Sequence, residues 1–212
     1  MGSSRRLWVV SVVVGAVIGA FSVLADGIIG GRLFGILGNI ASPWGLAGFF
    51  VGRLTTSPKR GAVAGTLTLV VGIAVYYAVG AARGYVVGEV NLVWTEIALV
   101  AGPVMGWSGA AISSEPERPP VLAVAAPSAM LVAEAIFLAI DREVWRYNLG
   151  AETYRLIDLG VMLALLVGGL ALPLFFEKDR HRRRIVYLIV ALVGVGGAIA
   201  FVALRELISR IA

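Results

Sequence analysis

GAVAGTLTLVVGIAVYYAVGAA, residues 61–82, contains 22 residues and not a single charge. As an α-helix it would be about 33 Å long at roughly 1.5 Å per residue, which matches the roughly 30 Å core of a bilayer. A backbone in lipid must satisfy its own hydrogen bonds, and this run lacks the alternating pattern of a barrel strand. It is therefore predicted to be a transmembrane helix.

Six other segments of the chain have the same apolar character. They are Leu7–Ala25, Leu33–Leu54, Asn91–Ile112, Val121–Ile140, Tyr154–Phe176 and Ile185–Leu204. The chain is 59% hydrophobic and 15% charged, with a mean hydropathy of +0.91, which lies outside the range of soluble domains. We expect an all-α, polytopic membrane protein of about seven transmembrane helices, forming a single transmembrane domain over residues 1–212.

The basic residues lie beside the apolar segments and predict how the chain is threaded. With the N-terminus in the cytoplasm, 11 of the 18 Lys and Arg residues fall inside and 7 outside, mainly because of EKDRHRRR, residues 177–184. The positive-inside rule therefore predicts a cytoplasmic N-terminus. These anchors account for the net charge of +5, so we expect no nucleic-acid partner.

The first apolar segment leaves two alternatives open. Arg5 and Arg6, followed by an apolar run that ends in VLA at Ala25, also fit a signal peptide, whose cleavage would leave six spans. We favour retention of the segment, because Gly15 and Gly19 form a small-residue face of the kind that packs against other membrane helices.

The second segment contains GNIASPW, residues 38–44, which a membrane helix does not readily accommodate. Ser42 is predicted to be the N-cap and Pro43 the first residue of a new helix. That helix would climb only about 15–17 Å before Arg53, roughly half the bilayer core. We predict a broken helix or a re-entrant hairpin, whose N-terminus suits an anion or a polar ligand group. The structural alternative is a simple kink, with Asn39 and Ser42 satisfying the freed backbone groups.

Acidic residues are predicted at a similar depth, in the outer half of the membrane. Glu134 lies in AMLVAEAIFLAI and Glu96 in LVWTEIALVAG. Burying a carboxylate in a membrane costs several kcal/mol, so each is a candidate for function unless it is paired within the protein. For Glu96 and Asp158 the structural alternative is a salt bridge to an arginine such as Arg83 or Arg155. Asp26 and Asp158 are predicted to lie nearer the outer interface than Glu134, and Asp26 is likewise expected to form a salt bridge.

These features together predict an outward-facing polar pocket. Its candidate substrate-binding residues are Asn39, Ser42, Trp44, Arg83, Glu96 and Glu134. Proline residues 103 and 127 lie within spans and favour bent helices around such a pocket.

Sequence motifs for catalysis are weak. GWSG, residues 106–109, matches the serine motif of rhomboid proteases, but the chain has one histidine, His181, and it lies in a basic loop rather than in a span. The absence of cysteine excludes disulfides and thiolate metal sites. We expect no enzyme activity, no metal and no cofactor.

The stretch ASPWGLAGFFVGRLTTSPKRGAVAGTLTLVVGIAVYYAVGAARGY, residues 41–85, resembles a family of uncharacterised actinobacterial multi-pass integral membrane proteins. Its members share the S-P-W break, a glycine-rich following helix and a basic turn. The resemblance implies a bacterial plasma-membrane location and no assigned activity. The small-residue face around Gly15 and Gly19 is also loosely similar to that of the substrate-binding membrane subunits of energy-coupling-factor transporters, which implies a ligand pocket that opens outward.

Two hypotheses from different classes follow. In the first, the protein binds or transports a small solute through a pocket built by the break and Glu134. In the second, it is a non-catalytic subunit or scaffold of a membrane complex, and Glu134 is an internal hydrogen-bond or salt-bridge partner. Its expected partners are the lipid bilayer, together with a small-molecule solute, another membrane protein or further copies of itself.

Overall fold

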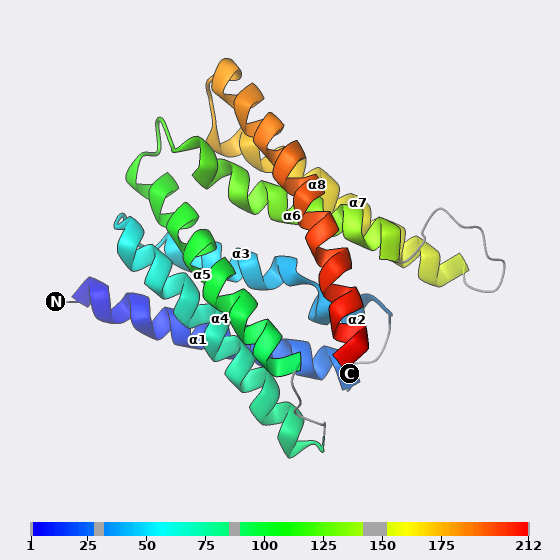
Figure 1. Cartoon of the computed structure of the whole chain (residues 1–212). Coiled ribbons are helices and arrows are strands. Elements are labelled where there is room, and N and C mark those ends of the chain that lie inside the picture. The colour runs from blue at the N-terminus through cyan, green and yellow to red at the C-terminus, as the bar shows by residue number, and fades with distance from the viewer. Residues whose placement is uncertain (1, 28–31, 85–89, 142–151, 212) are drawn as a thin grey trace.

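The computed structural model describes residues 2–27, 32–84, 90–141 and 152–211. Within these ranges the chain is helical and contains no strand. The helices, labelled in Figure 1, are α1 (Gly2–Gly27), α2 (Arg32–Asn39), α3 (Ala41–Gly52), α4 (Pro58–Ala82), α5 (Val90–Ser114), α6 (Val121–Asp141), α7 (Glu152–Phe176) and α8 (Arg180–Ile211).

Among the described residues, six helices are long and apolar enough to cross a bilayer: α1, α4, α5, α6, α7 and α8. The short helices α2 and α3 follow one another at a bend of 54° and together form a seventh candidate. The seven predicted segments, including the broken second one, are confirmed. The protein is a polytopic helical membrane protein.

The two ends of the bent pair contact α7 at points far apart along that helix. At one end, Arg32 at the start of α2 binds Asp158 near the start of α7 through contacts of 2.5 and 2.8 Å. At the other end, the guanidinium of Arg53, just after α3, lies 4.9 Å from the ring centroid of Phe176 at the end of α7. Between these points α7 is one continuous helix about 27 Å long. The pair is therefore a broken span, and the re-entrant hairpin that the sequence allowed is excluded.

One end of the bundle holds the N-terminus and the turns after α3, α5 and α7, with 11 of the 18 Lys and Arg residues in or next to them. Ser113 of α5 donates a 3.1 Å hydrogen bond to the carbonyl of Arg53, after α3. Arg182 of α8 donates to the carbonyl of Pro119, just before α6. In Figure 1 the N-terminus and these turns lie toward the left and upper left, and α8 runs away from them to the C-terminus. The spans therefore alternate in direction, as the predicted threading requires.

Helices α1, α4 and α5 pack by direct backbone contact. A Cβ on Gly19 would fall on the carbonyl of Gly72, and a Cβ on Gly106 would fall on the carbonyl of Gly61. Only glycine permits so close an approach. The predicted packing face of Gly15 and Gly19 is confirmed, and its partner is α4.

Helix α6 is the most buried of the six long helices. In its most apolar window 67% of residues are inside the protein, against 50% or fewer in the other five. It packs against α7 and α8 and also reaches α3 and α5. A side chain on the α3-facing side of α6 is therefore shielded from lipid, and this is the position of Glu134.

Candidate functional site

The break between α2 and α3 lies at Ile40. This residue has an extended backbone (φ −93°, ψ 148°), and its apolar side chain makes no capping hydrogen bond. The prediction that Ser42 is the N-cap and Pro43 the first helical residue is therefore wrong by two positions, because α3 begins at Ala41. The cap comes from a distant part of the chain.

The backbone N–H groups at the start of α3 all have hydrogen-bond acceptors, and the fourth residue, a proline, has no N–H group. The N–H of Ile40 donates a 3.1 Å hydrogen bond to a carbonyl one turn earlier in α2. The N–H groups of Ala41 and Ser42 donate to the two carboxylate oxygens of Glu134 at 2.5 and 2.7 Å. Pro43, the next residue, has no N–H to satisfy. The helix therefore starts at membrane depth without an unpaired amide, which lipid does not tolerate.

Glu134 projects from α6 and is only 3% exposed. Besides the two N–H groups, the hydroxyl of Ser42 donates to its Oε2 atom. All three donors lie in the first turn of α3, where the helix dipole stabilises a negative charge by about 0.3–2 kcal/mol. None of them is a cation. The carboxylate is thus held by backbone and hydroxyl donors, and it ties α6 to α3 across 92 residues of sequence.

Of the six predicted site residues, the structure brings Ser42 and Glu134 together. Asn39 flanks the break, but it is exposed and its amide donates a 2.8 Å hydrogen bond to a carbonyl within α2. Trp44 lies in the first turns of α3 and packs on α4, where a Cβ on Gly72 would lie 2.8 Å from its ring. The residues of GNIASPW therefore face different neighbours.

Arg83 and Glu96 lie elsewhere. Arg83 ends α4, and its guanidinium donates a 3.4 Å hydrogen bond to the carbonyl of Val23 in α1. Glu96 is exposed on α5. Neither residue forms a hydrogen bond or an ion pair with Glu134, whose donors all belong to α3.

The salt bridge predicted for Asp158 exists, but its partner differs from the prediction. Asp158 is buried and binds Arg32 of α2 rather than Arg83. The side chains of Asp26 and Arg155, the other residues of that prediction, lie outside the part of the structure that is described. The Arg32–Asp158 pair fixes the α2 end of the broken span against α7.

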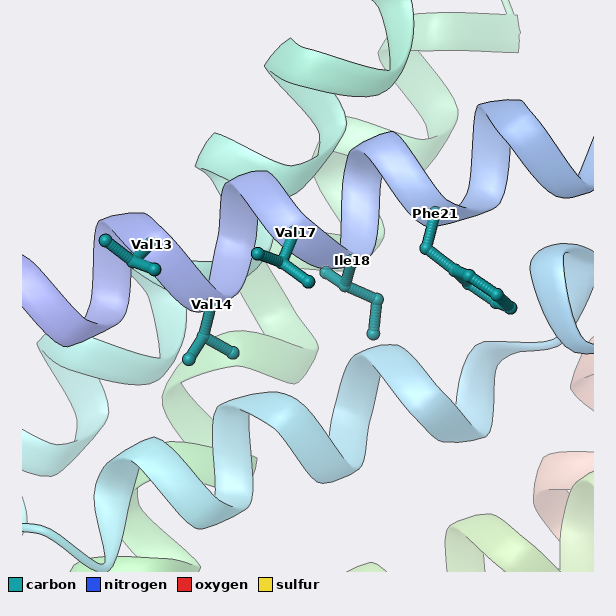
Figure 2. A pocket seen from close by; sticks show the side chains of 5 residues that line it. All are labelled: Val13, Val14, Val17, Ile18 and Phe21. Atoms are coloured by element: carbon teal, nitrogen blue, oxygen red, sulfur yellow. The ribbon is translucent and has the colours of Figure 1, made fainter.

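A groove of about 360 Å³ runs along α1, and Figure 2 shows three of its lining side chains, Val14, Ile18 and Phe21, on the side of α1 that faces α3. The full set of lining side chains is Val13, Val14, Val17, Ile18 and Phe21. The groove therefore offers no polar group to a ligand, and it is not the polar pocket predicted around Glu134. Glu134 itself is packed and paired.

A family model described as "Family of unknown function (DUF6518)" matches residues 2–208. The chain belongs to this family. No curated protein and no solved structure matches the chain. Membership in DUF6518 covers nearly the whole chain and agrees with the predicted resemblance to uncharacterised membrane proteins, whereas no link to energy-coupling-factor transporters is shown.

In this DUF6518 member the serine of the GWSG motif is a packing residue. Ser108 is fully buried, and its hydroxyl donates a 2.8 Å hydrogen bond to the carbonyl of Val104, one turn earlier in α5. The histidine of the chain, His181, is exposed in the first turn of α8.

Proposed function

We propose that this DUF6518 member binds or transports a small solute, and that the start of α3 is the element that recognises it. The carrying observation is a helix N-terminus inside the bundle whose N–H groups are held by a side chain from another helix, Glu134. Secondary transporters use broken helices of this kind, with the N-termini of half-helices directed at anionic groups of the substrate.

The contacts of Glu134 suggest how recognition works. A carboxylate or another hydrogen-bond acceptor on the solute would take the place of the Glu134 carboxylate on the N–H groups of Ala41 and Ser42. Protonation of Glu134 would favour this exchange, because a neutral carboxyl group loses its attraction to the positive end of α3. Intramembrane carboxyl groups serve as proton relays in many transporters. The proposal needs no catalytic residue, and it retains the loose similarity to energy-coupling-factor binding subunits as an analogy only.

A ligand screen tests this proposal. The protein, purified in detergent, is screened by thermal shift against organic acids, amino acids, vitamins and cations, and each hit is repeated with Glu134→Gln and Glu96→Gln. Glu96 is a matched control, because the same chemical change is made on an exposed acid outside the break. We expect stabilisation by a solute in the wild type and in Glu96→Gln that is reduced or lost in Glu134→Gln. A hit whose shift is the same in all three proteins would contradict the proposed site.

One observation favours the second candidate, a non-catalytic subunit or scaffold of a membrane complex. Both carboxylate oxygens of Glu134 are already hydrogen-bonded and shielded from solvent, as in a purely structural tie. In that case Glu134→Gln would lower the melting temperature and no solute would shift it. Isolation of the full-length protein in mild detergent would then be expected to retain a partner in fixed stoichiometry.

A further inference from the structure

The turn between α7 and α8 is braced by some of its own charged residues. Glu177 is 1% exposed and accepts a 2.9 Å hydrogen bond from Nε of Arg182, which also donates to the carbonyl of Pro119. Arg183 donates a 2.9 Å hydrogen bond to the carbonyl of Glu177. Two arginines of the basic run thus hold the turn together and tie it to the start of α6.

The other basic residues of the turn remain directed outward. Lys178, Arg180 and Arg184 are exposed, and within the described residues none of them forms an ion pair. The two acids of the turn are occupied: Glu177 is buried, and Asp179 accepts from backbone N–H groups in the first turn of α8. The turn and the first residues of α8 contain five basic residues against the two acids Glu177 and Asp179, so residues 177–184 keep a net positive charge, and three of the basic side chains are exposed.

An exposed apolar stripe continues from these charges along the membrane. Leu188 and Leu192 follow Arg184 at intervals of four residues and are 61% and 67% exposed, so the three side chains lie on one face of α8. On α7, Leu170 and Leu174 are also exposed. Helices α7 and α8 each pack mainly on α6, touch one another little, and diverge from their shared turn in Figure 1.

We propose that the α7–α8 turn binds an anionic phospholipid of the surrounding bilayer. The phosphate would lie against Lys178, Arg180 and Arg184, and the acyl chains along the exposed leucines of α7 and α8. Two features favour a phospholipid as the ligand: the positive charges complement its phosphate, and the apolar stripe beside them suits its acyl chains. A soluble anion would use only the basic part of this surface, and an apolar protein helix would use only the leucines. Basic sites beside membrane helices recognise anionic headgroups in this way.

The test measures lipid binding to the intact protein. Full-length protein in mild detergent is titrated with phosphatidylglycerol or with phosphatidylcholine of the same acyl chains, and bound lipid is counted by native mass spectrometry. The site variant is Arg180→Gln with Arg184→Gln. The matched control is Lys59→Gln with Arg60→Gln, two exposed basic residues at the same end of the bundle but on α4. All four positions are exposed, so both variants are expected to fold, which a monodisperse gel-filtration peak would establish.

We expect the wild type to prefer phosphatidylglycerol. The site variant should bind it more weakly by about fivefold for each arginine removed, roughly 25-fold in total, whereas the control should change little. Equal binding of the two lipids by the wild type would overturn the proposal. An equal loss in both variants would also overturn it, because it would indicate diffuse attraction to the basic end of the bundle rather than a site. Retention of a copurified protein that phosphatidylglycerol fails to displace would assign the surface to a protein partner instead.

Discussion

At the scale of single residues, Glu134 does the work that a serine or an aspartate usually does at the start of a helix. Its two oxygens accept hydrogen bonds from the backbone N–H groups of Ala41 and Ser42. The next residue, Pro43, has no N–H group that would need an acceptor. The hydrocarbon side chain of Ile40 has no atom that could accept a hydrogen bond from the start of α3. The carboxylate from α6 therefore allows α3 to begin inside the bundle. Glu134 therefore stabilises both the break and the contact between α3 and α6.

Truncating this side chain is predicted to be strongly destabilising. Glu134→Ala leaves two buried N–H groups and the Ser42 hydroxyl without their acceptor, and we expect a loss of about 2–4 kcal/mol in the free energy of unfolding. Glu134→Gln keeps one carbonyl acceptor and should lose less. Unfolding in mixed micelles, followed by circular dichroism, measures both values. Glu96→Ala serves as the control, and a loss in that variant as large as in Glu134→Ala would contradict the assignment.

The sequence predicts each half of this site but not their contact. An acid within an apolar run and an S-P break within another run are both visible, and both fall at a similar predicted depth. Which faces of the two helices meet depends on the rotation of α6 about its axis, and the sequence does not specify that rotation. For the same reason the sequence does not reveal that Arg83 and Glu96, predicted to line the same pocket, form no hydrogen bond or ion pair with Glu134.

At the scale of helices, the packing of α5 depends on glycine at particular positions. A Cβ on Gly106 would overlap the carbonyl of Gly61 and would lie 2.9 Å from the Cα of Gly65, both in the backbone of α4. Backbone cannot move aside as a flexible side chain does. By contrast, nothing lies within 4 Å of a Cβ placed on Gly160 of α7. The two positions therefore form a pair in which the same substitution has opposite consequences.

We predict that Gly106→Ala lowers the free energy of unfolding by about 1–3 kcal/mol, because α4 and α5 must separate to admit the methyl group. Gly160→Ala should be neutral or stabilising by up to about 1 kcal/mol, the usual preference of a helix for alanine. Thermal unfolding of the two variants in the same detergent compares them directly. Equal effects on stability would argue against close backbone contact between α4 and α5.

The start of α8 gives a pH-dependent prediction. Hydrogen bonds from the backbone N–H groups of Arg182 and His181, at 3.1 and 2.7 Å, lower the pKa of the Asp179 carboxyl. A lowered pKa in the folded state means that the ionised cap stabilises the fold above the unfolded pKa of about 4, and that this stabilisation is lost as the pH falls through the folded pKa. Asp179→Ala should therefore be less stable than the wild type at pH 6.

The difference between these two proteins should shrink steadily as the pH is lowered from 5 toward 3, because the wild-type carboxyl then becomes protonated. Melting temperatures measured at each pH would show it. Asp179→Asn, which retains a capping oxygen without a charge, separates the hydrogen bond from the ionisation. A difference between the wild type and Asp179→Ala that does not change with pH would contradict the role of the ionised cap.

At the scale of the whole molecule, composition and run length predict the class and the number of spans, because a bilayer imposes length and apolarity on every crossing segment. Which helices pack against one another is harder to predict from the sequence. The glycine pairs of α4 and α5 signal close packing, but the same signal does not say that Gly106 meets Gly61. Likewise, the sequence predicts a salt bridge for Asp158 but not its partner Arg32, because that pairing depends on the bend at Ile40, which directs α2 onto α7.

The orientation of the bundle gives a last prediction. The N-terminus and the turns after α3, α5 and α7 lie at one end, with 11 of the 18 Lys and Arg residues in or next to them, so the positive-inside rule predicts that this end faces the cytoplasm. Lys59 and Ala82 are exposed at opposite ends of α4. Because the chain contains no cysteine, Lys59→Cys and Ala82→Cys are single-cysteine variants without further changes.

In intact spheroplasts a membrane-impermeant maleimide should label the Ala82→Cys protein and should label the Lys59→Cys protein only after the membrane is permeabilised. The reverse labelling pattern would mean that the topology is inverted and that the contact between Glu134 and the start of α3 lies in the inner half of the membrane. Labelling of both variants in intact spheroplasts would mean that α4 does not cross the bilayer.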